Sequence, residues 1–310
     1  MTATLKRHAR NASFVALGFS LLLLSLVRTD LPTQELKATL AADNSVFETV
    51  DGLAVHLRDE GSGPPLLLIH GTSSSLHTWD GWAARLKGHR RVIRFDMPGF
   101  GLTEHPKDAD YRATRLARVA RGVLDRLGIE RADVAGNSLG GRVALTLALD
   151  APTKVRKLVL VDAAGLSGQK PPPIFKLART PVLGQLLRFV TPRFLVAKNV
   201  REVYGDPSRV TDAVVDRYYA LARREGNREA LLSRLNGPQD PPLDDRLREI
   251  KAPTLIEWGG RDAWIPPEFA ARLSAGIKGS RVVMYPGAGH VPMEEIPEET
   301  ARDAEAFLAE

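Results

Sequence analysis

Five residues near the middle of the chain, Gly136-Asn137-Ser138-Leu139-Gly140, have the G-x-S-x-G spacing of a nucleophilic serine. A serine on a sharp turn between a strand and a helix has strained backbone angles, so the positions two residues before and after it must be small. Gly136 and Gly140 meet this requirement. Unpaired N–H groups at the start of the helix also favour the negative charge that develops when a serine attacks a carbonyl. The pattern therefore predicts acyl-transfer chemistry at Ser138.

The flanking residues supply the strand and the helix that this turn requires. Residues 131–135 are a short apolar strand candidate, and residues 139–149 have the pattern of a buried helix. The alternative is an unreactive serine in a glycine-rich turn, and the order strand, serine, helix argues against it.

A histidine that follows the serine is needed for a triad that runs serine, acid, histidine along the chain. His290 is the one of seven histidines located after Ser138. It lies in the loop 286–292, after the strand candidate 281–285, and its glycine neighbours leave room for the imidazole to approach the serine. An isolated loop histidine is ordinarily a solvated surface residue, but the serine motif and the chain order favour His290 as the general base.

Two aspartates compete for the acid that orients the histidine. Asp262 follows the apolar strand candidate 253–258 through a Gly-Gly turn, and Asp162 ends the strand candidate 157–161. The acid must accept the Nδ1 proton of the histidine, so it needs a loop that aims its side chain. Asp262 fits better, whereas Asp162 can also be a strand-ending carboxylate or a helix N-cap. Asp96 precedes the serine and is interpreted as a turn former.

A loop after the apolar run 65–69 could supply backbone N–H groups for an oxyanion hole. Such a continuous apolar run is typical of a central parallel strand, and the loop that follows it begins at His70. The N–H of Thr72, or that of Ser73, and the N–H of Leu139 are predicted to stabilise a tetrahedral oxyanion, at about 2.7 to 4 kcal/mol per donor. His70 itself is interpreted as a structural residue of the loop.

Together these residues resemble the α/β-hydrolase superfamily over nearly the whole of residues 46–309. The matching pieces are His70-Gly71, Asp96-Met97-Pro98-Gly99-Phe100-Gly101, Gly136-Asn137-Ser138-Leu139-Gly140-Gly141, Trp258-Gly259-Gly260-Arg261-Asp262 and Gly289-His290. The resemblance implies an eight-stranded, mostly parallel sheet with helices on both faces, and neither a metal nor an organic cofactor. The alternation of strand and helix patterns along the chain agrees with this fold.

Residues 136–141 also look like the elbow of hydrolases that cleave carbon–carbon bonds in meta-cleavage products, and like that of many esterases. The chain departs from the former because residues 72–75 are Thr-Ser-Ser-Ser in place of a Gly/Pro-rich loop, and Val291 replaces a tryptophan after the histidine. Haloalkane dehalogenases and epoxide hydrolases use an aspartate nucleophile, so Ser138 argues against both. We therefore predict a serine hydrolase that cleaves a carboxylic ester or a related small acyl compound through an acyl-enzyme. The alternatives are a carbon–carbon hydrolase of the meta-cleavage type and a non-catalytic ligand-binding protein on the same fold.

Composition limits other classes of function. The 310 residues are 44% hydrophobic, which is enough for one large core. The net charge of +6 could suit nucleic acid, but the 43 basic residues are spread among 37 acidic ones without interleaved aromatic residues, so no nucleic-acid partner is predicted. The chain has no cysteine, which excludes disulfides, thiolate catalysis and cysteine-based zinc sites.

The N-terminus has the pattern of a separate unit. Residues 12–27 are a run of 16 mostly apolar residues between a basic flank and Arg28. As a helix the run would span about 24 Å, which is short of a hydrocarbon core of about 30 Å but within reach if flanking residues snorkel. No small-x-small cleavage site follows, so an uncleaved membrane anchor is favoured over a signal peptide. The basic flank predicts a catalytic domain on the non-cytoplasmic side, and the alternative is a secreted or periplasmic enzyme after cleavage.

These patterns predict the domain organisation. Residues 1–30 are the anchor or signal segment, residues 31–45 a tether, and residues 46–310 the hydrolase domain. From about 168 to 248 the strand pattern breaks, which indicates a helical cap inserted over the sheet. Caps usually shape the substrate pocket. Five apolar cap residues are candidate substrate contacts or, equally, members of a small core within the cap: Phe175, Leu183, Leu187, Phe194 and Tyr204.

Overall fold

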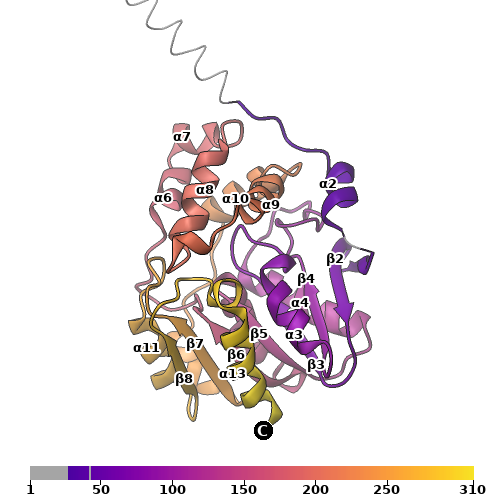
Figure 1. Ribbon diagram of the computed structural model, residues 1–310, viewed down its shortest axis with the longest axis vertical. Helices are drawn as coiled ribbons and strands as arrows, with labels where there is room; N and C mark the ends of the chain where they lie inside the picture. Colours follow the sequence, from indigo (N-terminus) through magenta and orange to yellow (C-terminus); the bar gives the residue numbers. More distant parts are fainter. Residues whose placement is uncertain (1–26, 42) are drawn as a thin grey trace, which may run out of the picture.

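A computed structural model describes residues 27–41 and 43–310 of the chain. One sheet of eight strands runs through its centre in the order β1-β2-β4-β3-β5-β6-β7-β8 (Figure 1). The strands are β1 (Ser45–Val50), β2 (Leu53–Glu60), β3 (Pro65–Ile69), β4 (Arg91–Phe95), β5 (Ala132–Asn137), β6 (Val155–Val161), β7 (Thr254–Gly259) and β8 (Arg281–Tyr285). The pairings of β2 with β1 and with β4 are antiparallel, and the other pairings are parallel. The mostly parallel eight-stranded sheet predicted from the sequence is confirmed.

The central strands are buried on both faces, as their continuous apolar runs predict. In β3, Leu67 and Ile69 pack into the cluster that contains residues of α4, α5 and α11, whereas Leu66 and Leu68 pack with residues of α3 and α13 on the opposite face. These helices are α3 (Asp80–Leu86), α4 (Ala113–Arg126), α5 (Leu139–Asp150), α11 (Glu268–Gly276) and α13 (Pro297–Ala309). Short helices complete the layers: η1 (Leu76–Trp79), η2 (Pro152–Lys154), η4 (Asp244–Glu249) and α12 (Pro292–Glu295).

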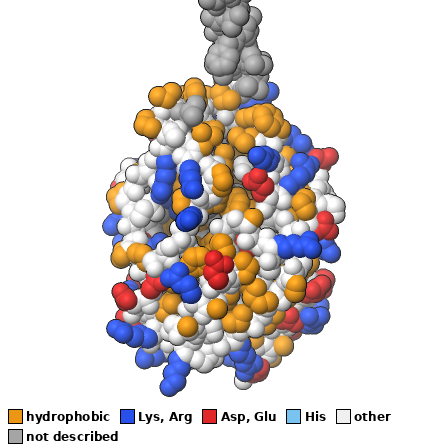
Figure 2. All heavy atoms as spheres, turned by 90° about the vertical axis from the view of Figure 1, so that its left-hand side faces the viewer, with side chains coloured by type: hydrophobic (Ala, Val, Ile, Leu, Met, Phe, Trp, Pro, Cys, Tyr) orange, Lys and Arg blue, Asp and Glu red, His pale blue; other side chains and the backbone are white. Residues whose placement is uncertain are grey.

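Further helices between β6 and β7 form a separate layer, which we call the cap (residues 173–236). Its elements are α6 (Pro173–Ala178), α7 (Pro181–Leu186), α8 (Arg193–Glu202), η3 (Pro207–Arg209), α9 (Asp212–Ala222) and α10 (Asn227–Asn236). In Figure 1 the cap helices lie together above one end of the sheet. Figure 2 shows hydrophobic side chains gathered at the cap end of the molecule. Exposed large hydrophobic residues of the cap are Leu177, Val182, Leu186, Phe189 and Phe194.

The segment predicted as a tether contains helix α2 (Thr33–Leu40). The buried Leu36 of this helix packs with Leu102 and Leu221. Just before the helix, the N–H of Leu31 donates to the carbonyl of Arg223 at 2.7 Å, and Leu31 forms a parallel bridge with Arg224. The segment is therefore bound to the turn between α9 and α10.

The prediction of a membrane-anchored enzyme on the non-cytoplasmic side is wrong on the structural finding. No helix within residues 27–41 and 43–310 is long and apolar enough to cross a bilayer. Helix α2, the first in the described part, has 8 residues and reaches about 12 Å at about 1.5 Å per residue, against a hydrocarbon core of about 30 Å. The apolar run on which the prediction rested lies, apart from Val27, outside the described residues.

Candidate active site

Ser138 stands between β5 and α5 and is the N-cap residue of that helix. Its backbone angles, φ 53° and ψ −116°, are strained for a residue with a side chain, and such a conformation persists only where the surroundings enforce it. Three backbone hydrogen bonds do so. The N–H of Ser138 donates to Val161 at 3.1 Å, and its carbonyl accepts from Arg142 at 3.1 Å and from Ala164 at 2.9 Å.

The two glycines of the motif are required by the close approach of neighbouring backbone. A Cβ atom at Gly136 would lie 2.2 Å from the carbonyl oxygen of Gly140. A Cβ atom at Gly140 would lie 2.1 Å from the carbonyl oxygen of Ile69. Both distances are far inside van der Waals contact, so the residues flanking Ser138 must be small for the turn to form.

His290 lies in the loop between β8 and α12, and its side chain is 3% exposed. Its Nδ1 is 2.7 Å from Oδ2 of Asp262. The other oxygen of Asp262 accepts the backbone N–H groups of Trp264 at 2.7 Å and Ile265 at 2.9 Å, so the carboxylate is held in one orientation. The N–H of His290 donates to the carbonyl of Val203 in the cap at 2.7 Å. Asp262 is therefore placed to accept the Nδ1 proton and leave Nε2 free as a base.

Ser138 and His290 line the same cavity, which lies between the sheet and the cap. Within the described part of the chain, no hydrogen bond joins the two side chains. Catalytic hydrogen bonds are often long in unliganded structures and tighten when substrate binds.

Asp162, the other candidate acid, follows β6 with φ 46° and is fully buried. Its Oδ1 accepts the N–H of Gly259 at 3.0 Å, and it does not cap a helix. Burial, together with the nearby negative charge of Asp262, raises the pKa of Asp162 well above its usual value. The environment of Asp162 therefore favours its protonated, neutral form, whereas Asp262 is the carboxyl that contacts His290.

Asp162, Asp262 and His290 also offer one possible metal-ligand atom each, and these atoms lie within 4.8 Å of one another. However, His290 Nδ1 and Asp262 Oδ2 already bind each other, and the second oxygen of Asp262 accepts two N–H groups. A cation would have to displace these hydrogen bonds, so the donor set fits an acid–histidine pair better than a metal site.

The loop after β3 runs directly against the serine. A Cβ atom at Gly71 would lie 3.2 Å from Cβ of Ser138, and Thr72 and Ser73 line the cavity. Ser73 has φ 59°, a second strained position beside Ser138. Leu139, the other predicted oxyanion donor, is the buried first residue of α5. The structure thus brings the loop of Thr72 and the start of α5 to the same serine.

His70 is engaged on both ring nitrogens. Its Nδ1 is 2.7 Å from the carbonyl of Gly71, and its Nε2 accepts the N–H of Met97 at 3.0 Å. Burial lowers the pKa of His70, so the ring stays neutral and holds the loop.

The cavity has a volume of about 180 Å³ and a mainly apolar wall. Of the cap residues singled out from the sequence, Phe175 and Leu187 line it, whereas Phe194 and Tyr204 line a separate surface hollow with Arg261. The side chain of Leu183 is outside the described part of the structure. Periodicity identifies apolar cap residues but cannot tell which cavity each one faces, because that depends on how the cap helices turn toward the sheet.

Asn137 and Glu295 also hold the loop that carries His290, and neither was predicted from the sequence to be a site residue. Asn137 Nδ2 donates to the carbonyl of His290 at 2.9 Å. Glu295 accepts the N–H of Gly289 at 2.8 Å and that of Gly205 in the cap at 2.9 Å. Asn137 lies inside the serine motif and could have been found there, whereas nothing in the sequence around Glu295 indicates its partners, which also include the N–H of Asp206 at 2.8 Å.

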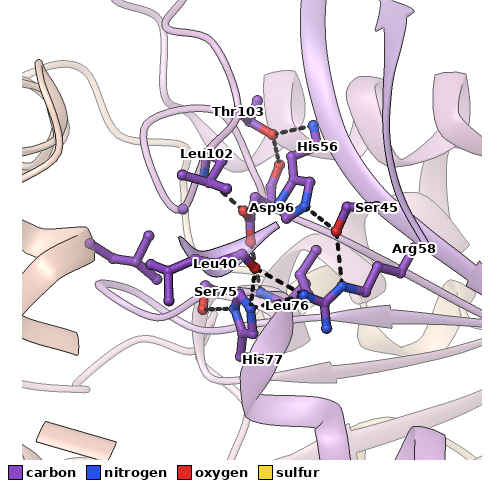
Figure 3. A network of polar contacts seen from close by, with 12 residues as sticks. Leu40, Ser45, His56, Arg58, Ser75, Leu76, His77, Asp96, Leu102 and Thr103 are labelled. Atoms are coloured by element: carbon purple, nitrogen blue, oxygen red, sulfur yellow. Dashed lines mark hydrogen bonds and ion pairs between the residues drawn. The ribbon is translucent and has the colours of Figure 1, made fainter. Parts of the chain in front are cut away.

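A second Ser-His-Asp chain joins Ser45 of β1, His56 of β2 and Asp96 after β4 (Figure 3). Ser45 Oγ is 2.9 Å from His56 Nε2, and His56 Nδ1 is 2.7 Å from Asp96 Oδ2. Ser45 Oγ also accepts from Arg58 Nε at 3.1 Å, and Asp96 accepts the N–H of Leu76 at 2.7 Å. Ser45 has an unstrained position in β1 and does not line the cavity that Ser138 and His290 line. This chain is interpreted as structural support for the turn at Asp96.

Comparison with known proteins identifies the family. Residues 64–297 match the family model of the alpha/beta hydrolase fold. The chain is 32% identical over 249 residues to 2-hydroxy-6-oxo-2,4-heptadienoate hydrolase of Pseudomonas putida, a match that covers 77% of this chain and 87% of the relative. A solved membrane phospholipase A, described as a bacterial virulence factor, is similar with a TM-score of 0.74 at 29% identity, covering 99% of this chain and 96% of the other. A meta-cleavage product hydrolase, CumD, has a TM-score of 0.74 at 25% identity over 85% of this chain and 97% of its own. The chain therefore belongs to the α/β-hydrolase fold family and is an enzyme of the hydrolase class.

Proposed function

We propose that Ser138 is the nucleophile of a serine hydrolase, that His290 is its general base and acid, and that Asp262 orients His290. The observation that carries this proposal is the 2.7 Å contact between His290 Nδ1 and Asp262 Oδ2 at the wall of the cavity that Ser138 lines. The strained backbone of Ser138 at the start of α5 supports it, since strain of this kind collects at functional residues.

In this proposal the Ser138 hydroxyl gives its proton to His290 Nε2 while Oγ bonds to the substrate carbonyl carbon. The N–H groups of Thr72 and Leu139 stabilise the resulting oxyanion. When the tetrahedral intermediate collapses, the leaving group departs and takes the proton from His290, and an acyl-enzyme remains. Water then adds to the acyl carbon, loses a proton to His290 and releases Ser138 and a carboxylic acid.

For the bond that is cleaved, the comparisons support the meta-cleavage alternative better than the ester first predicted from the sequence. The curated relatives at about one-third identity are named as hydrolases of 2-hydroxy-6-oxo-dienoates and of 2-hydroxymuconate semialdehyde. We therefore place carbon–carbon bond hydrolysis of such a compound first. Its leaving group would be a carbanion delocalised over the conjugated chain. The ligand-binding alternative has the least support, because these relatives are named as enzymes.

Ester hydrolysis is retained as the second candidate on two observations. The cavity wall is mainly apolar, as suits an acyl chain, and Val291 follows His290. In addition, Arg217 lies next to Tyr218, a residue of the cavity wall, and its Nη2 donates to Glu294 at 2.5 Å. The positive charge of Arg217 is therefore compensated before any anionic substrate enters.

A turnover panel on the purified enzyme separates the two reactions. It compares 2-hydroxy-6-oxo-hepta-2,4-dienoate with lactones and p-nitrophenyl esters of increasing acyl length, each also assayed with Ser138→Ala. Serine-dependent turnover with kcat/KM highest on the dienoate supports carbon–carbon cleavage, and a preference for an ester at every length reverses the order of the two candidates. Lack of serine-dependent turnover on the whole panel argues against the proposed nucleophile.

Arg228 provides a further means of separating the substrates. This residue of α10 is 9% exposed and lines the cavity, and its Nη1 has no hydrogen-bond partner among the described residues. Its Nε and Nη2 bind Asp30. We expect Arg228→Gln to raise KM for the dienoate by about tenfold, since a hydrogen bond to a charged group contributes about 1.5 to 3 kcal/mol. The KM for a neutral ester should change by less than about twofold, because it has no carboxylate to lose.

The matched control is Arg223→Gln. Arg223 lies five residues earlier and binds the carbonyl of Thr29 but does not line the cavity. An equal rise in KM for both substrate types in Arg228→Gln, or the same rise in Arg223→Gln, would show that Arg228 does not select for an anionic group.

A further inference from the structure

A cap arginine binds the loop that carries a predicted oxyanion donor. Arg234, on α10, donates from Nη2 to Oγ1 of Thr72 at 2.8 Å. Thr72 lines the cavity, and the preceding residue, Gly71, packs against Ser138. The guanidinium of Arg234 thus contacts the side chain of the residue whose backbone N–H is the proposed oxyanion donor.

No carboxylate compensates this charge. Arg234 forms no ion pair with any described residue, and its Nε is enclosed without a hydrogen-bond partner. The charged groups that act on it most are two other cations, Arg142 and Arg179. Burial and these two cations lower the pKa of Arg234 to about 10, so it remains charged at neutral pH.

The surroundings of the two other arginines explain why the charge stays uncompensated. Arg142 donates to the carbonyls of Asp240 and Pro241, and Arg179 donates to the carbonyl of Leu235, so both bind neutral oxygens. The nearby carboxylate of Asp240 is occupied by the N–H and the hydroxyl of Thr114. Arg234 is partly buried, and a partly desolvated charge without a counter-charge costs the folded protein free energy. We therefore expect the Arg234 charge to be compensated only when negative charge forms on the substrate during the reaction.

We propose that Arg234 is a positioning residue for the oxyanion: it fixes Thr72 through Oγ1 and places a positive charge behind the loop that faces Ser138. The inference rests on the proposed function, because it requires an oxyanion at Ser138. A bound substrate carbonyl is neutral, whereas the tetrahedral intermediate is anionic, so a fixed cation at this position stabilises the intermediate more than the bound substrate. The Arg234 charge therefore raises kcat and leaves substrate affinity largely unchanged.

The test uses the full chain with the substrate that the panel identifies, and compares Arg234→Gln with Arg234→Lys. Glutamine can still donate to Thr72 but carries no charge, and lysine keeps the charge. Because removing a direct oxyanion donor lowers kcat by about 10²- to 10³-fold, we expect this indirect contact to give a kcat loss of about 10- to 100-fold in Arg234→Gln, with KM within about twofold. Arg234→Lys should recover most of the loss.

Phenylboronic acid gives a second readout, since it forms a tetrahedral anion on a reactive serine. Its affinity should fall in Arg234→Gln by about the same factor as kcat, whereas the affinity of the unreacted substrate for the Ser138→Ala enzyme should be the same with or without the Arg234→Gln change. Arg179→Gln is the matched control, because Arg179 belongs to the same group of cations but does not contact Thr72. It should leave kcat within about twofold.

Thermal unfolding separates this role from a structural one. Removing an uncompensated, partly buried charge should leave the unfolding temperature of Arg234→Gln unchanged or raise it while kcat falls. A lower unfolding temperature with unchanged kcat would make Arg234 a tether between cap and sheet and overturn the proposal. A rise in KM with unchanged kcat would also overturn it.

Fluorophosphonate labelling distinguishes failure of this inference from failure of the proposed function. If wild type is labelled at Ser138 but Arg234→Gln keeps its kcat and boronate affinity, the role of Arg234 is wrong and the serine mechanism stands. If wild type is not labelled at Ser138, the serine mechanism and the role of Arg234 both fail.

Discussion

Ser138→Ala is expected to lower kcat by on the order of 10⁶-fold, the scale at which serine triads lose activity when the nucleophile is removed. A fluorophosphonate probe should label the wild-type enzyme and leave the variant unlabelled. The fold should be preserved, because the three hydrogen bonds that hold residue 138 are made by its backbone and do not need the serine side chain. Intact mass and peptide mapping measure the labelling, and circular dichroism checks the fold.

The second Ser-His-Asp chain makes Ser45→Ala an informative control for this experiment. Ser45 has hydrogen bonds to a histidine and an arginine but has no strained backbone and does not line the cavity of Ser138, so the variant should keep both labelling and turnover. An adduct that maps to Ser45, or a Ser138→Ala enzyme that still turns over substrate, would refute the assignment of the nucleophile.

Asp262→Asn is expected to lower kcat by up to about 10⁴-fold, because an asparagine in this place favours the wrong histidine tautomer. Asp162→Asn should lower it far less. The pKa of Asp162 is raised well above its usual value, so an uncharged amide resembles the protonated form that burial favours, and the hydrogen bond that Asp162 accepts comes from the N–H of Gly259. Steady-state kinetics of the two variants decides between the acids. A larger loss in Asp162→Asn than in Asp262→Asn would move the orienting role to the end of β6.

The same comparison has a stability readout with a defined sign. The folded state binds the Asp162 proton more tightly than the unfolded chain does, so the free energy of unfolding falls as pH rises above the unfolded pKa of about 4 and continues to fall until the folded pKa is passed. The amide that replaces this carboxyl in Asp162→Asn does not titrate. The variant should therefore lose less stability than wild type between about pH 4 and neutral pH, which denaturant unfolding at several pH values measures.

Several features of the site could be predicted from the sequence because they depend on short-range constraints. The small residues at positions 136 and 140 are imposed by backbone that lies a few residues away or in the adjoining strand. The continuous apolar run of β3 reports burial on both faces, which a central parallel strand requires. The position of His290 after the serine follows from chain order in the family. These features identify the fold and predict the nucleophile before any coordinate is known.

The membrane prediction shows the limit of the same reasoning. It rested on the apolarity of residues 12–27, which apart from Val27 lie outside the described residues, and the segment that follows, around Leu31 and Leu36, packs against α9 and Leu102. Hydropathy measures how much an apolar segment gains by leaving water, and that gain has the same sign in a bilayer and in a protein core.

The sequence favoured Asp262 over Asp162 on its loop, and only the tertiary structure shows that Asp262 contacts His290, because both aspartates follow parallel strands at the same end of the sheet. The roles proposed for them rest on the desolvation of Asp162 and on the hydrogen bonds that each loop supplies. Likewise, which cap side chains line the cavity and where Arg234 places its charge depend on contacts between residues far apart in the chain, such as Thr72 and Arg234. The sequence alone determined the fold family and predicted the serine and the histidine, since strand and helix periodicity and the turn at Ser138 are local properties. Packing of the chain brought Asp262 to His290 and set the apolar wall of the cavity and the place of the Arg234 charge, because burial and electrostatic compensation depend on residues far apart in the sequence.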